Sequence, residues 1–148
     1  MIARTALLAL LGAGLSFDAD PFIGTWKPNP DKWKDSAGAP ESRKHDLIKW
    51  EAVAKDHYRS TPISPDGKPG VTVDLFLDGK EHAVGDGDLA FVRRLSENHI
   101  SISVKGPKGA TTLDYIVSID GKTLTVNRKG VGTKSGRVID EMHEYDKR

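Results

Sequence analysis

The chain has 148 residues, which is enough for one domain with a single core. Its 22 basic and 21 acidic residues give a formal net charge of +1, so composition predicts no nucleic-acid or polyanion partner. The absence of cysteine excludes disulfides, thiol nucleophiles and Cys-ligated zinc.

Residues 1–19 have the composition of a secretory signal. Arg4 supplies a positive start, Ala6–Leu11 is apolar, and small residues follow, with cleavage after Ser16 or after Ala19. The apolar run is far shorter than the roughly twenty residues that a membrane span needs. We therefore expect a cleaved signal, a periplasmic or secreted protein with no stable membrane span, and one domain over residues 20–148.

The first irregular stretch runs from Asn29 to Lys44; Pro28 just before it and Pro30, Gly38 and Pro40 within it break regular structure. Within it, Asp31–Asp35 is expected to form one helical turn, capped by Asn29 or Asp31. Trp33 is expected to anchor this stretch, with a lid over a barrel mouth as the alternative.

Short strand-like runs separated by turn residues fill the rest of the chain. In His99–Lys105, for example, Ile100, Ile102 and Val104 alternate with serines, which indicates one buried and one solvated face. The predicted strands after the irregular stretch are Asp46–Val53, His57–Ile63, Val71–Leu77, Lys80–Val84, Leu89–Ser96, His99–Lys105, Thr111–Ile119, Lys122–Lys129 and Arg137–Tyr145.

These connections are short, so neighbouring strands must be antiparallel. A long sheet with one apolar face buries that face by curling, and closure also removes its exposed edges. The sequence therefore predicts an all-β, up-and-down antiparallel meander closed into a lipocalin-like barrel of about 8–10 strands. A β-sandwich is the alternative.

Both ends of the folded region resemble a known family. Pro21–Lys27, which contains Gly24 and Trp26, resembles the N-terminal signature of the calycins, the group of lipocalins and fatty-acid-binding proteins. His143–Lys147 resembles the closing segment of the fatty-acid-binding group. The chain is also similar in style to small exported bacterial proteins described as lipocalin-like.

This resemblance implies roles for particular residues. It implies that the first strand begins at Gly24 and that Trp26 packs across the closed end of the barrel. It also implies that a basic residue of the last strand covers Trp26, and Arg137 is the candidate. The fatty-acid-binding group holds a ligand carboxylate with an Arg-x-Tyr pair. Tyr145 matches the tyrosine, whereas His143 replaces the arginine, so a permanent clamp is not expected. The Pro-rich segment after the first strand also argues against that group's helical pair.

Four residues are the candidate ligand contacts: Arg93, Tyr115, His143 and Tyr145. Arg93 lies between Phe91 and Leu95, and would be buried and need a partner if that face pointed inward; a local register shift that turns it to water is the alternative.

Catalytic and metal-binding patterns are not seen. The spacing of the five histidines predicts no metal site, no cofactor motif is present, and no catalytic constellation is evident, so we expect a protein that is not an enzyme.

The predicted function is binding of a small apolar or amphiphilic molecule inside the barrel. One alternative is a non-catalytic interaction or envelope module with a side-chain-filled core, and another is a barrel enzyme acting on a small lipophilic substrate. The sequence leaves the ligand's identity and the oligomeric state open. An interior void of roughly 300 Å³ or more distinguishes a binder from a filled core.

Overall fold

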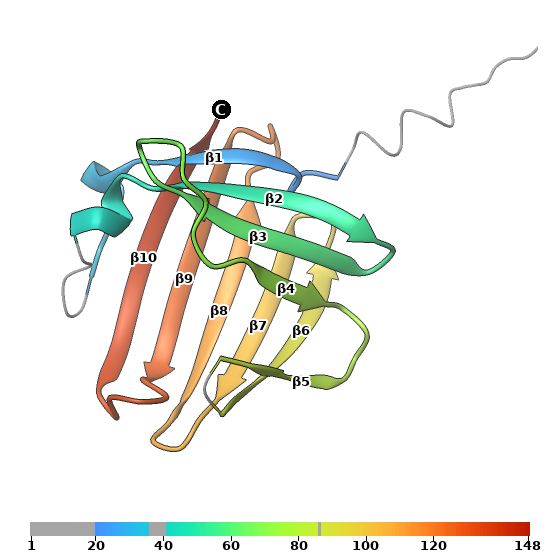
Figure 1. Ribbon diagram of the computed structural model, residues 1–148, viewed down its shortest axis with the longest axis vertical. Helices are drawn as coiled ribbons and strands as arrows, with labels where there is room; N and C mark the ends of the chain where they lie inside the picture. The colour runs from blue at the N-terminus through green and yellow to red at the C-terminus, as the bar shows by residue number, and fades with distance from the viewer. Residues whose placement is uncertain (1–19, 36–40, 86) are drawn as a thin grey trace, which may run out of the picture.

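The structure is a computed structural model that describes residues 20–35, 41–85 and 87–148 (Figure 1). The signal expected over residues 1–19 lies outside them. Among the described residues, no helix has the length and apolar character needed to cross a membrane.

The described residues form ten strands and two short 3-10 helices. The 3-10 helices are η2 (Pro30–Lys32) and η3 (Glu41–Lys44). The strands are β1 (Gly24–Pro28), β2 (Leu47–Ala54), β3 (His57–Ile63), β4 (Val73–Phe76), β5 (Glu81–Val84), β6 (Asp88–Ser96), β7 (His99–Lys105), β8 (Ala110–Val117), β9 (Thr123–Val131) and β10 (Val138–Lys147).

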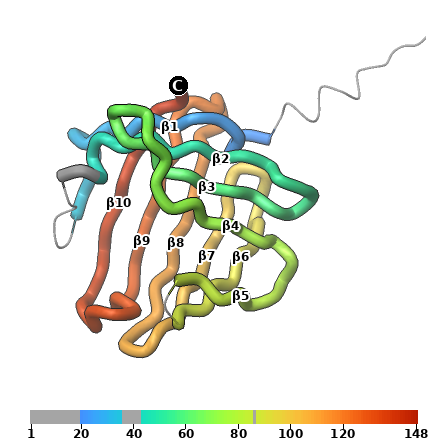
Figure 2. Tube along the Cα trace, in the orientation of Figure 1, coloured from blue at the N-terminus to red at the C-terminus, as the bar shows by residue number. Residues whose placement is uncertain are grey.

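All ten strands belong to one antiparallel sheet in the order β4-β3-β2-β1-β10-β9-β8-β7-β6-β5. The sheet curls into a nearly closed barrel in which β4 and β5 come near each other without a shared ladder (Figure 2). The predicted antiparallel barrel is therefore confirmed, and the sandwich alternative is wrong because there is one sheet rather than two packed layers.

The core gathers at one end of the barrel. Phe22, Trp26 and Trp50 are fully or almost fully buried there, and the Phe22 and Trp50 rings lie 5.4 Å apart. The Trp26 indole Nε1 donates to the Phe22 carbonyl at 3.1 Å, which satisfies the one polar atom of its side chain. This end of the barrel is therefore filled by side chains.

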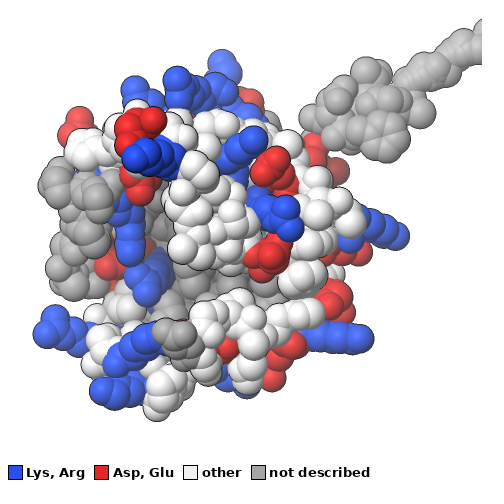
Figure 3. Space-filling view, in the orientation of Figure 1, with Lys and Arg blue, Asp and Glu red and all other residues white. Residues whose placement is uncertain are grey.

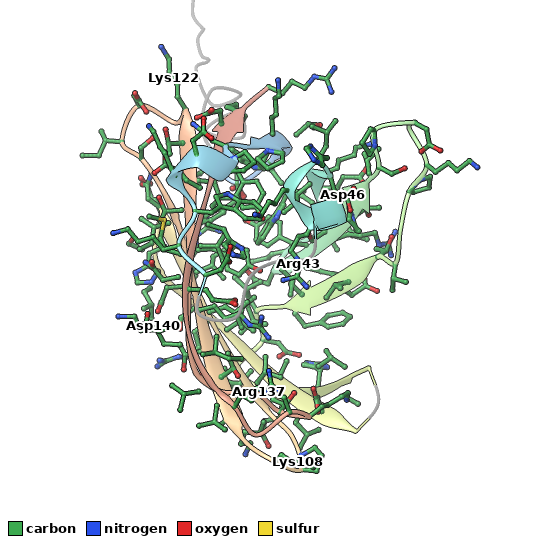
Figure 4. The ribbon with its side chains drawn as sticks, turned by 90° about the vertical axis from the view of Figure 1, so that its left-hand side faces the viewer. Arg43, Asp46, Lys108, Lys122, Arg137 and Asp140 are labelled. Atoms are coloured by element: carbon green, nitrogen blue, oxygen red, sulfur yellow. The ribbon has the colours of Figure 1, made fainter. Side chains whose placement is uncertain are left out.

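The basic residue over Trp26 is Lys147, not Arg137. Lys147 Nζ lies 4.7 Å from the centroid of the Trp26 ring and donates to the Ile23 carbonyl at 2.7 Å. Gly24 leaves room for the Lys147 stem, because a Cβ there would lie 2.8 Å from Lys147 Cε. Arg137 precedes β10 and lies beside Lys108 at the opposite end of the barrel (Figure 4), so the sequence-based candidate is corrected.

A second polar network covers the same end from β6. Arg94 donates to the Tyr58 hydroxyl at 2.6 Å, and its guanidinium lies 5.5 Å from the centroid of the Phe22 ring. Tyr58 in turn donates to Asp20. Burial, followed by the bond to Asp20, raises the pKa of Tyr58. The network ties residues at the start of the described chain to β3 and β6.

The seam between β4 and β5 is bridged by rings. Phe76 of β4 stacks on His57 of β3 at 4.2 Å and on His82 of β5 at 4.7 Å between centroids. The space-filling view shows a hollow on this side of the molecule, between β4 above and β5 below (Figure 3). Positive and negative side chains are both present around it, and neither sign dominates.

Candidate functional site

The barrel interior contains an elongated cavity with two lobes. The apolar lobe, about 360 Å³, lies toward the seam and is lined mainly by Trp50, Val73, Leu75, Val84, Ala90 and Ile102. The polar lobe, also about 360 Å³, is lined in part by Arg43, Thr111, Arg128, Thr133, His143 and Tyr145. Asp88, Val104, Leu113 and Tyr115 line both lobes, so the two lobes adjoin at these residues.

Strand alternation places the polar groups. On β10 the side chains of Glu141, His143 and Tyr145 are buried, because every second residue of a strand faces the same side. In the ladder with β9, Glu141 pairs with Arg128 and His143 with Val126. Together with β8, which also lines the lobe, these two strands direct a mixed set of polar and apolar groups into it.

Two tyrosine hydroxyls face this lobe. Burial raises the pKa of Tyr115, although the positive charges of Arg128 and Arg43 oppose the shift. Burial also raises the pKa of Tyr145 well above its usual range. Both side chains are therefore neutral near pH 7 and keep their O–H donors, for which the described residues provide no hydrogen-bond partner.

Two arginines supply positive charge beside these hydroxyls. Arg128 Nη1 donates to Glu141 Oε1 at 3.3 Å, which uses one of the five N–H donors of the guanidinium. Arg43 comes from η3 and points into the space between the β8–β10 wall and the β2–β4 wall (Figure 4). Arg43 also lines a third hollow, of about 500 Å³, with Ile48, Tyr115 and Tyr145.

The segment after β1 closes the side of the polar lobe. Lys34 forms an isolated antiparallel bridge with Met142, with N–O distances of 2.8 Å in both directions. Trp33 stacks on His143 with centroids 4.0 Å apart, and its Nε1 donates to the Glu144 carbonyl at 2.8 Å. Asp35 Oδ1 lies 2.5 Å from His143 Nε2. Trp33 is therefore fixed against β10 as an anchor of this segment.

Three of the four predicted ligand contacts come together, and one does not. Tyr115, His143 and Tyr145 all line the polar lobe. Arg93 is exposed on the outer face, where its guanidinium lies 5.8 Å from the centroid of the Phe91 ring. Its neighbours Ala90 and Val92 are the buried residues of β6, so the placement of Arg93 in the interior is corrected.

Sequence reasoning missed Asp35, Arg43, Arg128 and Glu141. The first two lie in the Pro-rich stretch, which carries no periodic signal. On β9, Arg128 continues the inward alternation of Leu124 and Val126. On β10, Glu141 shares the inward face with His143 and Tyr145. The two-residue period of a strand could therefore have identified both.

The fold is a small antiparallel β-barrel like those of lipocalins and fatty-acid-binding proteins. No protein-family model and no curated protein sequence matches the chain.

Solved structures do match it. The chain is similar to a Schistosoma mansoni fatty acid binding protein in complex with arachidonic acid, with a TM-score of 0.65 and 14% identity over 88% of this chain and 98% of that one. It is also similar to Echinococcus granulosus fatty-acid-binding protein 1, with a TM-score of 0.61 and 14% identity over 86% and 97% of the two chains. For the Manduca sexta fatty-acid-binding protein the TM-score is 0.55 and the identity 19%, over 86% and 99%. At these identities the likeness shows the fold.

Proposed function

We propose that this protein binds a small amphiphilic molecule, such as a fatty acid, with its chain in the apolar lobe and its polar head in the polar lobe. The observation that carries the proposal is that an apolar lobe and a polar lobe adjoin inside the barrel, since this matches a ligand that is apolar at one end and polar at the other.

The polar lobe fits an anionic head group. The hydroxyls of Tyr115 and Tyr145, which have no partner among the described residues, are donors, and Arg128 keeps donors that Glu141 does not use. A carboxylate placed among them would gain hydrogen bonds and partial charge compensation, which offsets the cost of removing it from water.

The cavity volume also bears on the alternatives. Each lobe exceeds the roughly 300 Å³ that separates a ligand site from a packed interior, which favours a binder over a module with a filled core. The similar solved structures are named for fatty-acid binding rather than for catalysis, which supports a binding protein over an enzyme.

Displacement of a fluorescent fatty acid by oleate tests the proposal. Leu113, which lines both lobes, is changed to Trp to fill the region where they adjoin, and we expect oleate affinity to fall at least about 10-fold. Ile116→Trp is the matched control, because Ile116 lies on the same strand but on its exposed face. Equal affinity in both variants, or no binding by the unmodified protein, would contradict the proposal.

The polar head has a separate test. A lost hydrogen bond to a charged group costs about 1.5–3 kcal/mol, so Tyr145→Phe should weaken oleate binding by about 10- to 100-fold. The neutral analogue oleyl alcohol should lose much less. A similar loss for both ligands would show that no anionic head lies beside Tyr145.

We further propose, from the composition of residues 1–19, that the protein is exported to the periplasm or secreted. Cell fractionation and the mass of the mature N-terminus test this: a chain starting at Phe17 or Asp20 is expected, and a cytoplasmic full-length chain would contradict it.

A further inference from the structure

Three potential metal ligands converge at the side of the polar lobe. One oxygen each from Asp35 and Glu141 and one nitrogen of His143 all lie within 4.8 Å of one another. About nine-tenths of each side chain is buried: their exposed fractions are 10%, 9% and 9%. Such a buried, mixed set differs from the exposed carboxylate clusters that are common on protein surfaces.

The backbone register explains why these groups meet. The Lys34–Met142 bridge is antiparallel, so it places Asp35 opposite Glu141 and Trp33 opposite His143. Two carboxylates directly opposite each other repel, and burial strengthens that repulsion. Asp35 contacts His143, and Glu141 contacts Arg128, but a dication between the carboxylates would compensate both at once.

We propose that Asp35, Glu141 and His143 form a binding site for a divalent transition-metal ion, with Zn²⁺ as the best chemical match. Imidazole nitrogen with two carboxylate oxygens is a donor set that suits zinc, whereas Ca²⁺ and Mg²⁺ prefer sites made entirely of oxygen. The inference does not depend on an apolar ligand in the barrel.

Modest side-chain movement would complete the site. Zinc lies about 2.0–2.2 Å from nitrogen and oxygen ligands, so tetrahedral ligand atoms are about 3.3 Å apart. Asp35 Oδ1 and His143 Nε2, now 2.5 Å apart, would separate slightly, and Glu141 would turn from Arg128 toward the ion. His143 also lines the polar lobe, so water from that lobe would supply the fourth ligand.

Isothermal titration of the full chain with ZnCl₂, after removal of bound metal by a chelator, tests the proposal. We expect one site per chain with a Kd of about 10 µM or tighter. Asp35→Asn, Glu141→Gln and His143→Gln should each weaken binding at least about 10-fold. Calcium and magnesium chlorides should not compete at equal concentration.

The fold provides a matched control. His99 Nε2 lies 2.7 Å from Asp114 Oδ1 in another His–Asp pair, but neither belongs to a three-ligand group among the residues that the structure describes. His99→Gln should leave zinc affinity within about two-fold. A loss equal to that of His143→Gln would overturn the proposal, and so would the absence of a stoichiometric site in the unmodified protein.

Two further readouts keep the proposal testable if a ligand variant fails to fold. Arg128→Gln releases Glu141 from its ion pair, so zinc should bind more tightly to this variant; unchanged or weaker binding would contradict the assignment. Co²⁺ should quench the fluorescence of Trp33, which stacks on His143, and Trp33→Phe should remove most of the quenching. Quenching that persists in Trp33→Phe would place the ion elsewhere.

Discussion

The filled end of the barrel provides the sharpest stability test, through the substitution Trp26→Ala. Trp26 has no exposed surface, and an aromatic side chain of this kind buries about 150–250 Å². At about 25 cal/mol per Å² this burial contributes about 4–6 kcal/mol as an upper estimate. Truncations of large buried aromatics cost about 3–5 kcal/mol, so we expect a loss of about 4 kcal/mol.

Two smaller substitutions separate the contributions of this residue. Trp26→Phe keeps a ring but removes the Nε1 donor, which leaves the Phe22 carbonyl without that partner and should cost about 1–3 kcal/mol. Lys147→Met removes the cation near the ring. Because Lys147 is largely exposed, the coupling between these two substitutions should be about 0.5–1 kcal/mol in a double-mutant cycle.

Urea unfolding followed by far-UV circular dichroism measures these losses without relying on tryptophan fluorescence. Ile119→Ala is the control, since this fully exposed side chain should change the free energy of unfolding by less than about 0.5 kcal/mol. A loss below about 1 kcal/mol for Trp26→Ala would refute the view that this indole stabilises the closed end. Zero coupling with Lys147→Met would refute the cation–ring contact alone.

Three other predictions follow from separate features. Because the pKa values of Tyr115 and Tyr145 are raised in the folded state, their contribution to stability is fully present below about pH 10 and is lost as the pH rises through the folded-state values. Urea unfolding from pH 8 to 12 should show this decline in the free energy of unfolding. The decline should be smaller in Tyr145→Phe. Gly130→Ala should cost about 3 kcal/mol or more, because φ is +130° and the new Cβ would lie 2.3 Å from the Ala110 carbonyl oxygen, whereas Gly121→Ala, with φ of +76° and open space, should cost only about 1 kcal/mol in the same assay. Phe76→Ala should remove both ring stacks at the seam, lower stability by about 1–3 kcal/mol and speed hydrogen exchange in β4 and β5, whereas unchanged exchange would show that the rings do not hold the seam.

The strands were predictable wherever apolar residues occupy only one face. His99–Lys105 matches β7 at both ends, since isoleucines and serines separate cleanly there. The predicted strand over Val71–Leu77 shortens to β4, because Val71 lies 82% exposed outside the ladder. Hydrophobic period alone cannot detect the loss of a pairing partner.

The wrong placement of Arg93 also comes from a limit of the hydrophobic pattern. On β6 apolar residues occupy both faces, with Leu89 and Phe91 outward and Ala90 and Val92 inward, so the alternation does not determine which way Arg93 points. Tyr115 was easier to identify because its strand alternates more clearly.

Asp35 could not be assigned from local pattern. It is 108 positions from His143 in sequence, and only the tertiary bridge of Lys34 to Met142 brings the two side chains together. Arg137 was chosen as the start of the last strand, but β10 runs on to Lys147, and that final residue reaches Trp26.

The way in which the cylinder is joined between β4 and β5 has a mechanical consequence. Elsewhere the barrel wall can widen only if rows of backbone N–H···O=C hydrogen bonds break. The freed N–H and C=O groups must then bind water. Across this join Phe76 of β4 stacks on His82 of β5, and such a contact is worth only about 0.5–1.5 kcal/mol. Thermal opening should therefore concentrate between β4 and β5, beside the apolar lobe, while the backbone pairing of the other strands stays intact.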